Sequence, residues 1–253
     1  MNKENTAPHQ MQGPVCPIPH RHNEAIVIGH GSGGQMTRDL ILNVFQTKIG
    51  NPYLAQGNDA ARLSLGEGKI AVSTDSHVVS PLFYNGGDIG RLAVCGTVND
   101  VAMLGANPAF LTAGFILEEG LPMESLSRII VSMGQACQEA GVQIVAGDTK
   151  VVEKGKADGV FINTSGIGVI PPGRHIGGEL ARPGDAVLIS GSLGDHAIAI
   201  LEARGELGFE SQISSDLAPL NHMIGTLLDV VPDVHVLRDP TRGGLATTLK
   251  EIA

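Results

Sequence analysis

Aspartates recur beside the short β-branched runs of this sequence. They are Asp59 in GNDAAR, Asp75 in STDS, Asp100 in TVND, Asp148 in GDTK and Asp239 in RDPTRGG. Open α/β sheets bind ligands beyond the carboxyl ends of their strands, so several of these side chains are expected to converge on one site. Converging carboxylates need a cation, and oxygen ligands with few His or Cys nearby select Mg²⁺ together with substrate phosphates. The set therefore predicts a metal–nucleotide site, although any one of these aspartates could equally cap a helix or hold a turn.

A glycine-rich stretch, His30-Gly31-Ser32-Gly33-Gly34, precedes a helical pattern. Its backbone N–H groups and the positive end of the helix could cradle phosphate oxygens. It is not a Walker A loop, because the Lys-Ser/Thr ending is missing, and a plain connection is the alternative. Lys150 and Arg242 follow Asp148 and Asp239 closely. These cations could balance charge or reach phosphate, and the sequence leaves both roles open.

The three cysteines are widely spaced and contain no CxxC pair, which disfavours a disulfide framework or a zinc site. Cys95 and Cys137 lie in apolar helical patterns and are predicted to be inert core thiols. In the Pro-rich arm, Cys16, His20 and His22 could bind a metal, but a disordered arm is the favoured interpretation.

The histidines of the folded region have no partner at metal-ligand spacing, and structural or surface roles are predicted for His77 and His196. His77 follows Asp75 by two residues.

The composition excludes several classes of protein. Of the 253 residues 42% are hydrophobic and 17% charged, so the chain can form a sizeable core. The net charge of -9 and the 3% aromatic content disfavour a nucleic-acid partner. The sequence shows neither an apolar run of about 18 residues nor a signal peptide, so a cytoplasmic protein without membrane association is predicted.

From Ala25 onward, β-branched runs alternate with helical patterns, which is typical of an α/β protein. Residues 1–24 are predicted to be a flexible tail. A helix is expected after the glycine-rich stretch, with Ser32 as its N-cap and an apolar face that includes Met36, Leu40, Ile41, Val44 and Phe45. Further helices are expected at 88–104 and 124–140, and strands at 69–74, 142–146 and 161–170.

The Pro171-Pro172-Gly173 stretch predicts a boundary between an N-terminal domain, 25–170, and a C-terminal domain, 171–253. The second domain is expected to contain strands at 186–190 and 234–237 and helices at 195–207 and 216–230. An apolar stripe predicts a last helix after Gly244, which reaches Ala253 without a cap or a return strand. The second domain is therefore expected to be incomplete.

Several of these segments resemble one known family. They are HGSGG, STDSHVVSPLFYNGGDIGRLAVCGTVNDVAMLGANP, GFILEEGLP, GDTKVVEKGKADGVFINTSGIG, GSLGDH and LRDPTRGG. Together they resemble the HypE family of hydrogenase maturation factors, within the aminoimidazole ribonucleotide (AIR) synthetase (PurM) superfamily. The resemblance runs from about Ile28 to the last residue, and its long run from Asp75 to Pro108 is specific to the family.

This resemblance implies a homodimeric, two-domain PurM/AIR synthetase-like α/β fold that binds ATP and Mg²⁺. Matched by motif, the nucleotide-binding positions are Gly31, Ser32, Gly33, Gly34, Asp59, Asp75, Asn99, Asp100, Asp148, Thr149, Asp239, Thr241 and Arg242. The implied metal ligands are Asp59, Asp75, Asp100 and Asp239. Lys150 matches a lysine that relays protons in the family's reaction.

The implied reaction is an ATP-dependent carbamoyl dehydration. A partner carbamoyltransferase, HypF, places a carbamoyl group on the thiol of a C-terminal cysteine. ATP phosphorylates the thiocarboxamide oxygen, and loss of phosphate leaves a thiocyanate. The cyanide then passes to iron on a HypC–HypD scaffold for the [NiFe] hydrogenase centre. An amide oxygen leaves poorly, and phosphoryl transfer makes it a good leaving group.

The sequence departs from the family pattern at its end. It closes with Lys250-Glu251-Ile252-Ala253, without the family's terminal cysteine, and it lacks an Asn-Glu-Gly segment whose acidic residue joins the proton relay. We therefore expect these residues alone not to complete the cyanation. Two alternatives remain open: a non-catalytic, nucleotide-binding dimer, and another superfamily enzyme such as selenophosphate synthetase, for which Cys16 is the only candidate reactive cysteine.

Overall fold

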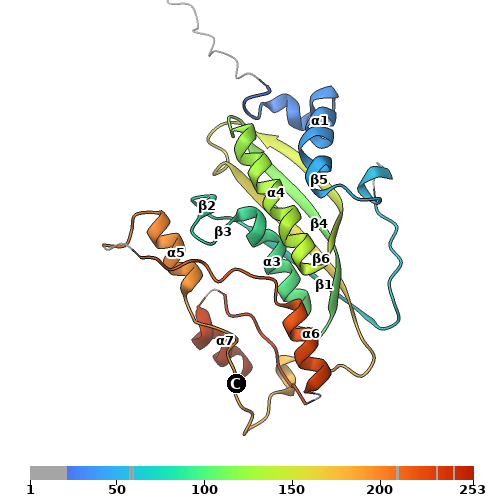
Figure 1. The fold of residues 1–253 in the computed structure, drawn as a ribbon, viewed down its shortest axis with the longest axis vertical. Coiled ribbons are helices and arrows are strands. Elements are labelled where there is room, and N and C mark those ends of the chain that lie inside the picture. Colours follow the sequence, from blue (N-terminus) through green and yellow to red (C-terminus); the bar gives the residue numbers. More distant parts are fainter. Residues whose placement is uncertain (1–21, 57, 59, 209–210, 232, 242) are drawn as a thin grey trace, which may run out of the picture.

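Four strands form the central sheet of the computed structural model, which describes residues 22–56, 58, 60–208, 211–231, 233–241 and 243–253. The strands are β1 (Lys69–His77), β4 (Asn107–Glu118), β5 (Gln143–Val152) and β6 (Val160–Ile170). Their order is β1-β6-β4-β5 (Figure 1). β6 pairs antiparallel with β1 and β4, and β4 pairs parallel with β5. The strands expected in this half of the chain are confirmed, and β1 and β5 are longer than expected.

Two helices cover one face of the sheet, α3 (Ile89–Ala102) and α4 (Met123–Ala140) (Figure 1). α3 begins where the Asp88 carboxylate accepts from the N–H groups of Gly90 and Arg91, which is an N-cap. α4 ends at Gly141, whose φ of 71° is left-handed and favours glycine. Both helices lie where the apolar periodicity predicts them.

The core lies between these helices and the sheet. Along β4 the buried residues alternate, from Leu111 to Leu117, and they face α3 and α4. On the opposite face Ile70, Val72 and Ile116 are exposed. Burial of each large apolar side chain contributes about 1.5–3 kcal/mol, so the helix-covered face carries most of the stability.

The chain enters this unit through a bridge between Ala25 and Pro122. A 3-10 helix (Ile28–Gly31), α1 (Gln35–Leu40), a π-helical turn (Ile41–Phe45) and α2 (Gln46–Ile49) follow. The expected N-cap is wrong: Gly34 holds that position, and the Ser32 hydroxyl donates instead to the Gly29 carbonyl. The expected apolar face is buried at Leu40, Val44 and Phe45, whereas Ile41 is exposed.

Short elements complete the first unit. They are a 3-10 turn (Leu54–Gln56) and a hairpin of β2 (Phe83–Tyr84) and β3 (Gly87–Asp88), which follows a cis peptide bond at Ser80-Pro81. This hairpin lies beside the N-terminus of α3.

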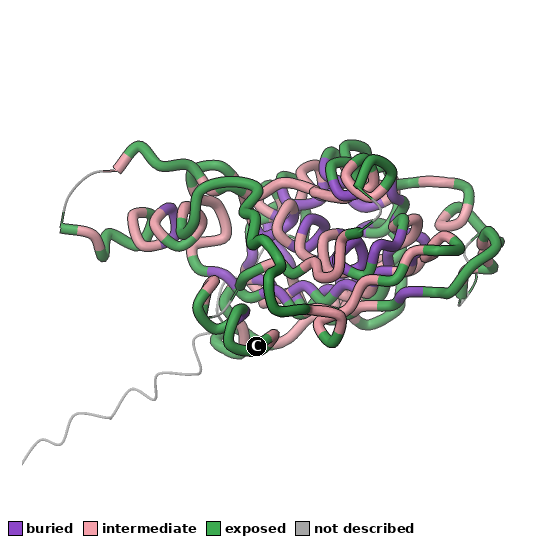
Figure 2. The backbone as a smooth tube through the Cα atoms, turned by 90° about the horizontal axis from the view of Figure 1, so that it is seen from below, coloured by how far each residue is buried: buried purple, intermediate pink, exposed green. Residues whose placement is uncertain are grey.

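We call the chain up to the end of β6 the first unit and the chain after β6 the second unit. The second unit contains a 3-10 turn (Gly178–Leu180) and the helices α5 (Asp195–Ala203), α6 (Asn221–Val230) and α7 (Gly244–Ile252). The expected strands at 186–190 and 234–237 are wrong, because both runs are irregular and pair with no strand of the described chain. Val187 and Leu188 are 63% and 86% exposed. Figure 2 shows that buried residues gather in the sheet unit and are sparse in the second.

α5 and α6 are shorter than their apolar patterns suggest, and α6 begins at Asn221 rather than near 216. None of the helices in the described part of the chain is both long enough and apolar enough for a membrane span.

Candidate functional site

Asp75 and Asp100 lie on facing elements. β1 turns Ser73 and Asp75 toward α3, because its alternate residues Ala71 and His77 are buried there. The Ser73 hydroxyl donates to Asp100 Oδ2 at 2.8 Å. The two carboxylates therefore lie along one side of α3.

A glycine makes this approach possible. Gly96 lies one turn before Asp100 on α3. A Cβ at Gly96 would lie 3.2 Å from the His77 ring and 3.6 Å from Asp75 Oδ2. A larger side chain at this position would therefore displace the strand carrying Asp75.

Asp239 joins these carboxylates from the second unit. It is half-buried, and its carboxyl lies beside that of Asp100. Burial is the main cause that raises the pKa of Asp239 to about 7, and the negative charge of Asp100 is the second cause. Two carboxylates in contact require a shared proton or a cation. We call Asp75, Asp100 and Asp239 the acidic cluster.

A neutral histidine lies beneath the acidic cluster. His77 is buried, and desolvation lowers its pKa despite the charges of Asp75 and Asp100. Its Nε2 lies 3.1 Å from the Thr164 hydroxyl, and its Nδ1 lies 3.8 Å from Asp75 Oδ2. The Thr164 hydroxyl also lies 2.6 Å from that of Thr97. The structural role expected for His77 agrees with this buried network.

The glycine-rich stretch lies against β5, at the other edge of the sheet. A Cβ on Gly31 would meet the Val151 backbone nitrogen at 2.6 Å, so only glycine permits this approach. The Lys150 ammonium donates to Asp148 at 3.1 Å, and 65% and 68% of these two side chains are exposed. We call Gly31 to Gly34, Asp148 and Lys150 the β5 group.

The acidic cluster and the β5 group do not meet within one chain. β1 and β5 are the two edges of the sheet, three strand spacings or about 14 Å apart. Asp75 faces the helices, whereas Asp148 and Lys150 share the opposite face with the exposed Ile116. Strand alternation and strand order therefore separate Asp75 from Asp148 within one chain, and the predicted convergence of several aspartates on one site stays a prediction.

The remaining predicted positions lie on several different elements. Thr149 on β5 is half-buried and pairs in register with Phe115 of β4. Thr241 is exposed and follows Asp239 by two residues. Asn99 uses its carboxamide to bind the backbone of residues 218 and 220. Asp59, Arg242, Cys16 and His20 lie outside the described residues.

Ser73 was not among the residues singled out from the sequence. Its signal was its position two residues before Asp75 in a strand, which places both on one face. Cys95 and Cys137 are buried, and desolvation raises the pKa of each thiol to about 12, as expected for inert core cysteines.

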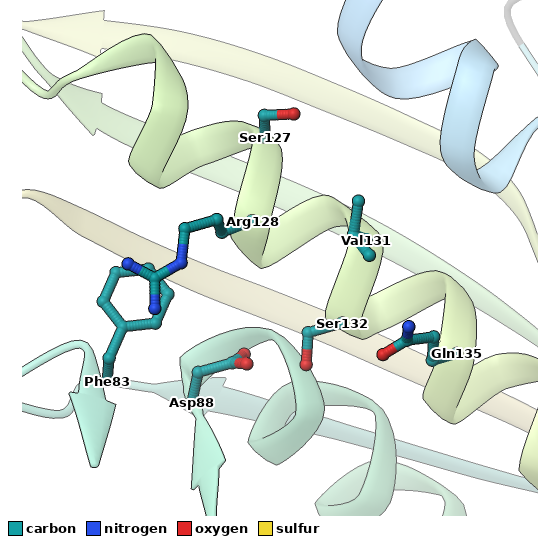
Figure 3. A pocket seen from close by; sticks show the side chains of 7 residues that line it. All are labelled: Phe83, Asp88, Ser127, Arg128, Val131, Ser132 and Gln135. Atoms are coloured by element: carbon teal, nitrogen blue, oxygen red, sulfur yellow. The ribbon is translucent and has the colours of Figure 1, made fainter.

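A hollow of about 330 Å³ lies between α4 and the β2–β3 hairpin (Figure 3). Arg128 stacks over the Phe83 ring at 3.9 Å, and Asp88 faces the same space. The hollow contains no residue of the acidic cluster or the β5 group.

Comparison with known families identifies the chain. Residues 57–170 match the AIR synthase related protein, N-terminal domain, and residues 182–253 match the corresponding C-terminal domain. Carbamoyl dehydratase HypE of Azotobacter vinelandii is 55% identical over 231 residues, which are 91% of this chain and 68% of that protein. The chain belongs to the HypE family. The family resemblance seen in the sequence is thereby confirmed.

Solved HypE structures show the same fold. HypE in complex with ATP is 57% identical with a TM-score of 0.86, over 89% of this chain and 67% of that one. The HypE of a HypE–HypF complex is 56% identical with a TM-score of 0.71, over 84% of this chain and 69% of that one. The expected two-domain AIR synthetase-like class is confirmed, and the chain spans about two thirds of the length of these HypE proteins.

The donor set of the acidic cluster fits magnesium. Mg²⁺ binds through one or two carboxylates plus substrate phosphates, and Asp100 and Asp239 offer two carboxylates in contact. Within the described ranges, no three acidic, histidine or cysteine side chains are close enough to enclose an ion. Asp100 and Asp239 would hold such an ion only together with ligands from a nucleotide.

Proposed function

We propose that this HypE-family chain acts in [NiFe] hydrogenase maturation as an ATP-dependent carbamoyl dehydratase, like the relatives named above. The observation that carries this proposal is the contact between Asp100 and Asp239, which brings both units of the chain to one carboxylate pair. Asp100 and Asp239 would hold a cation there, and this cation would supply the positive charge that attracts the phosphates of ATP. ATP supplies the phosphoryl group that converts the thiocarboxamide oxygen into a leaving group.

Within this proposal the chain's own residues position charge. Asp100 and Asp239 and, from the matched motifs, Asp59 and Asp75 would hold magnesium only together with the phosphates of a nucleotide, and the glycine-rich stretch would donate backbone N–H groups to phosphate oxygens. Thr149, Thr241 and Arg242 lie beside these positions in the sequence and contribute to nucleotide binding.

Lys150 moves a proton during the dehydration. Removal of water from the thiocarboxamide takes both protons from its nitrogen, so a base near that atom is required. Asp148, 3.1 Å from the Lys150 ammonium, holds the lysine in place on the exposed face of β5.

A homodimer completes the site in this proposal. The acidic cluster and the β5 group lie on opposite faces and edges of one sheet, so the two groups can join only across two copies. The exposed face of the sheet carries Ile70 and Val72, which are 58% and 65% exposed, and offers an apolar surface for the second copy.

The thiol that carries the carbamoyl group is neither Cys95 nor Cys137. Both are buried with a pKa of about 12, so neither forms the thiolate needed to accept the group. The remaining partners are HypF as the carbamoyltransferase and HypC–HypD as the iron scaffold, in the cytoplasm and without nucleic acid. A HypE relative assembles with HypF in a solved complex, which supports the first of these.

A peptide that contains the Asn-Glu-Gly segment and ends in S-carbamoyl cysteine provides the test, because it supplies both the acidic residue and the carrier thiol in trans. We expect Mg·ATP to bind in calorimetry, and the peptide to lose water in mass spectrometry only when ATP is present. Lys150→Ala should bind Mg·ATP but abolish this loss, while Lys154→Ala, in the exposed loop after β5, should not.

The outcomes separate the alternatives. Absence of Mg·ATP binding would overturn the proposal. Binding without any change in the peptide would instead favour the non-catalytic, nucleotide-binding dimer. An ATP-dependent mass change on Cys95 or Cys137 would contradict the assignment of the carrier thiol.

A further inference from the structure

The segment that precedes α6 is bound along α3. Arg91 Nε donates to the Leu217 carbonyl at 3.1 Å, and Asn99 Nδ2 donates to the Ala218 carbonyl at 3.1 Å. The Leu220 N–H donates to Asn99 Oδ1 at 2.8 Å. Arg91 and Asn99 lie about two helical turns apart, so they hold the segment at two points on one side of α3.

The Asn99 carboxamide hydrogen-bonds with backbone groups of residues 218 and 220, as a neighbouring strand would. Its carboxamide donates and accepts at the same time, which replaces the ladder bonds that residues 218 and 220 lack. These bonds hold residues 218 and 220 against α3 directly before α6, which begins at Asn221. Each of the two polar atoms of the Asn99 carboxamide therefore makes one hydrogen bond within the fold.

The next residue on α3 is Asp100, which meets Asp239. Asp239 belongs to the same unit as residues 217–220, and that unit has few buried residues of its own. The position of Asp239 therefore depends on how the second unit is attached to α3. Asn99 provides this attachment one residue away from the carboxylate that Asp239 contacts.

We infer that Asn99 is a positioning residue, which docks the second unit on α3 so that Asp239 reaches Asp100. The inference rests on the proposed function for its consequence in nucleotide binding, but the docking itself is independent of that function. Asn99 thereby acts through the backbone of residues 218–220.

Other bonds keep the second unit attached when Asn99 is changed. Asn221 donates to the Ala140 carbonyl at 2.8 Å on α4. Arg174 donates to the Gly105 carbonyl at 3.0 Å and to Asp229 at 2.7 Å. Loss of the Asn99 carboxamide should therefore loosen the segment without unfolding the chain.

Hydrogen exchange on the whole chain tests the docking without any ligand. Asn99→Ala should raise the exchange of the Leu220 amide and of the amides of Arg238, Asp239 and Thr241 together, by about tenfold. Asn99→Asp keeps the acceptor for Leu220 and should show a smaller increase, and it serves if the alanine variant does not fold. The matched control is Asn221→Ala, which removes a bond to α4 and should leave the amides of 238–241 unchanged.

A double-mutant cycle on Mg·ATP affinity then tests the consequence. Asn99→Ala should weaken binding about five- to tenfold, and it should add little when Asp239→Asn is already present, because both changes act through one contact. Additive losses, or unchanged affinity in Asn99→Ala, would overturn the inference. If the unchanged chain binds no Mg·ATP, the proposed function fails and exchange alone decides: faster exchange at 238–241 supports the docking role, and unchanged exchange refutes it.

Discussion

The carboxyl of Asp239 in the second unit lies beside that of Asp100 on α3, although the two residues lie far apart in the chain. This contact is the place where the two units share charged groups. It concentrates negative charge at a half-buried position, where either a proton or a cation must compensate it. The contact therefore gives the protein a pH dependence and a cation dependence that can be measured separately.

The first prediction concerns stability against pH. The pKa of Asp239 is about 7 in the folded chain, against an ordinary value of 3.8. The folded state therefore favours the protonated carboxyl. The contribution of Asp239 to the free energy of unfolding is complete below pH 4 and is lost as the pH rises to 7. We expect a loss of roughly 2–4 kcal/mol in the free energy of unfolding across this window. Urea unfolding at intervals between pH 4 and pH 8 measures it.

Asp239→Asn is the control for this pH dependence. An amide cannot ionise, so the variant should lose less stability over the same interval. Identical curves for the two proteins would show that other groups dominate and that the carboxylate pair is not under strain at neutral pH.

The second prediction concerns the glycine-rich stretch. Gly31→Ala should displace this stretch from β5, because the new Cβ would lie 2.6 Å from the Val151 nitrogen. We expect a loss of about 1–3 kcal/mol in thermal or urea unfolding, together with weaker Mg·ATP binding. Gly66→Ala is the matched control, since nothing lies within 4 Å of its Cβ position and it lies outside the β5 group. Equal effects of the two substitutions would argue against a packing role for Gly31.

The third prediction concerns thiol reactivity. Cys95 and Cys137 are buried and their pKa is raised to about 12, so neither should react with iodoacetamide in the folded chain up to pH 9. Both should react after unfolding in urea. Peptide mass spectrometry locates the label, and alkylation of either cysteine in the native protein would contradict this account.

The fourth prediction concerns the exposed sheet face. Val72→Glu should weaken self-association by about 1–3 kcal/mol, because it places a charge in an apolar contact. Light scattering after size exclusion measures the mass. Leu188→Glu is the control, because Leu188 is 86% exposed and lies outside the sheet. A dimer that tolerates Val72→Glu but not Leu188→Glu would place the contact on the second unit.

The sequence alone was sufficient for the family and for most elements of the first unit. The Asp75 to Pro108 run indicates the HypE family, and apolar periodicity predicts α3 and α4. This pattern is local, because the periodicity of a helix is set within a few residues. The same reasoning correctly assigns Cys95 and Cys137 to the core.

Tertiary structure decided what local pattern could not. Residues 186–190 have the composition of a strand, but they pair with no strand in the described part of the chain. A strand forms only where a neighbouring strand satisfies its backbone hydrogen bonds. Asp75 and Asp148 look equivalent in sequence, yet strand order and alternation place them on opposite edges and faces of the sheet. Asn99 and Asp100 are neighbours, and only the docking of residues 217–220 and of Asp239 separates their roles. Contacts between distant segments depend on chain topology, which residue types and their spacing do not specify.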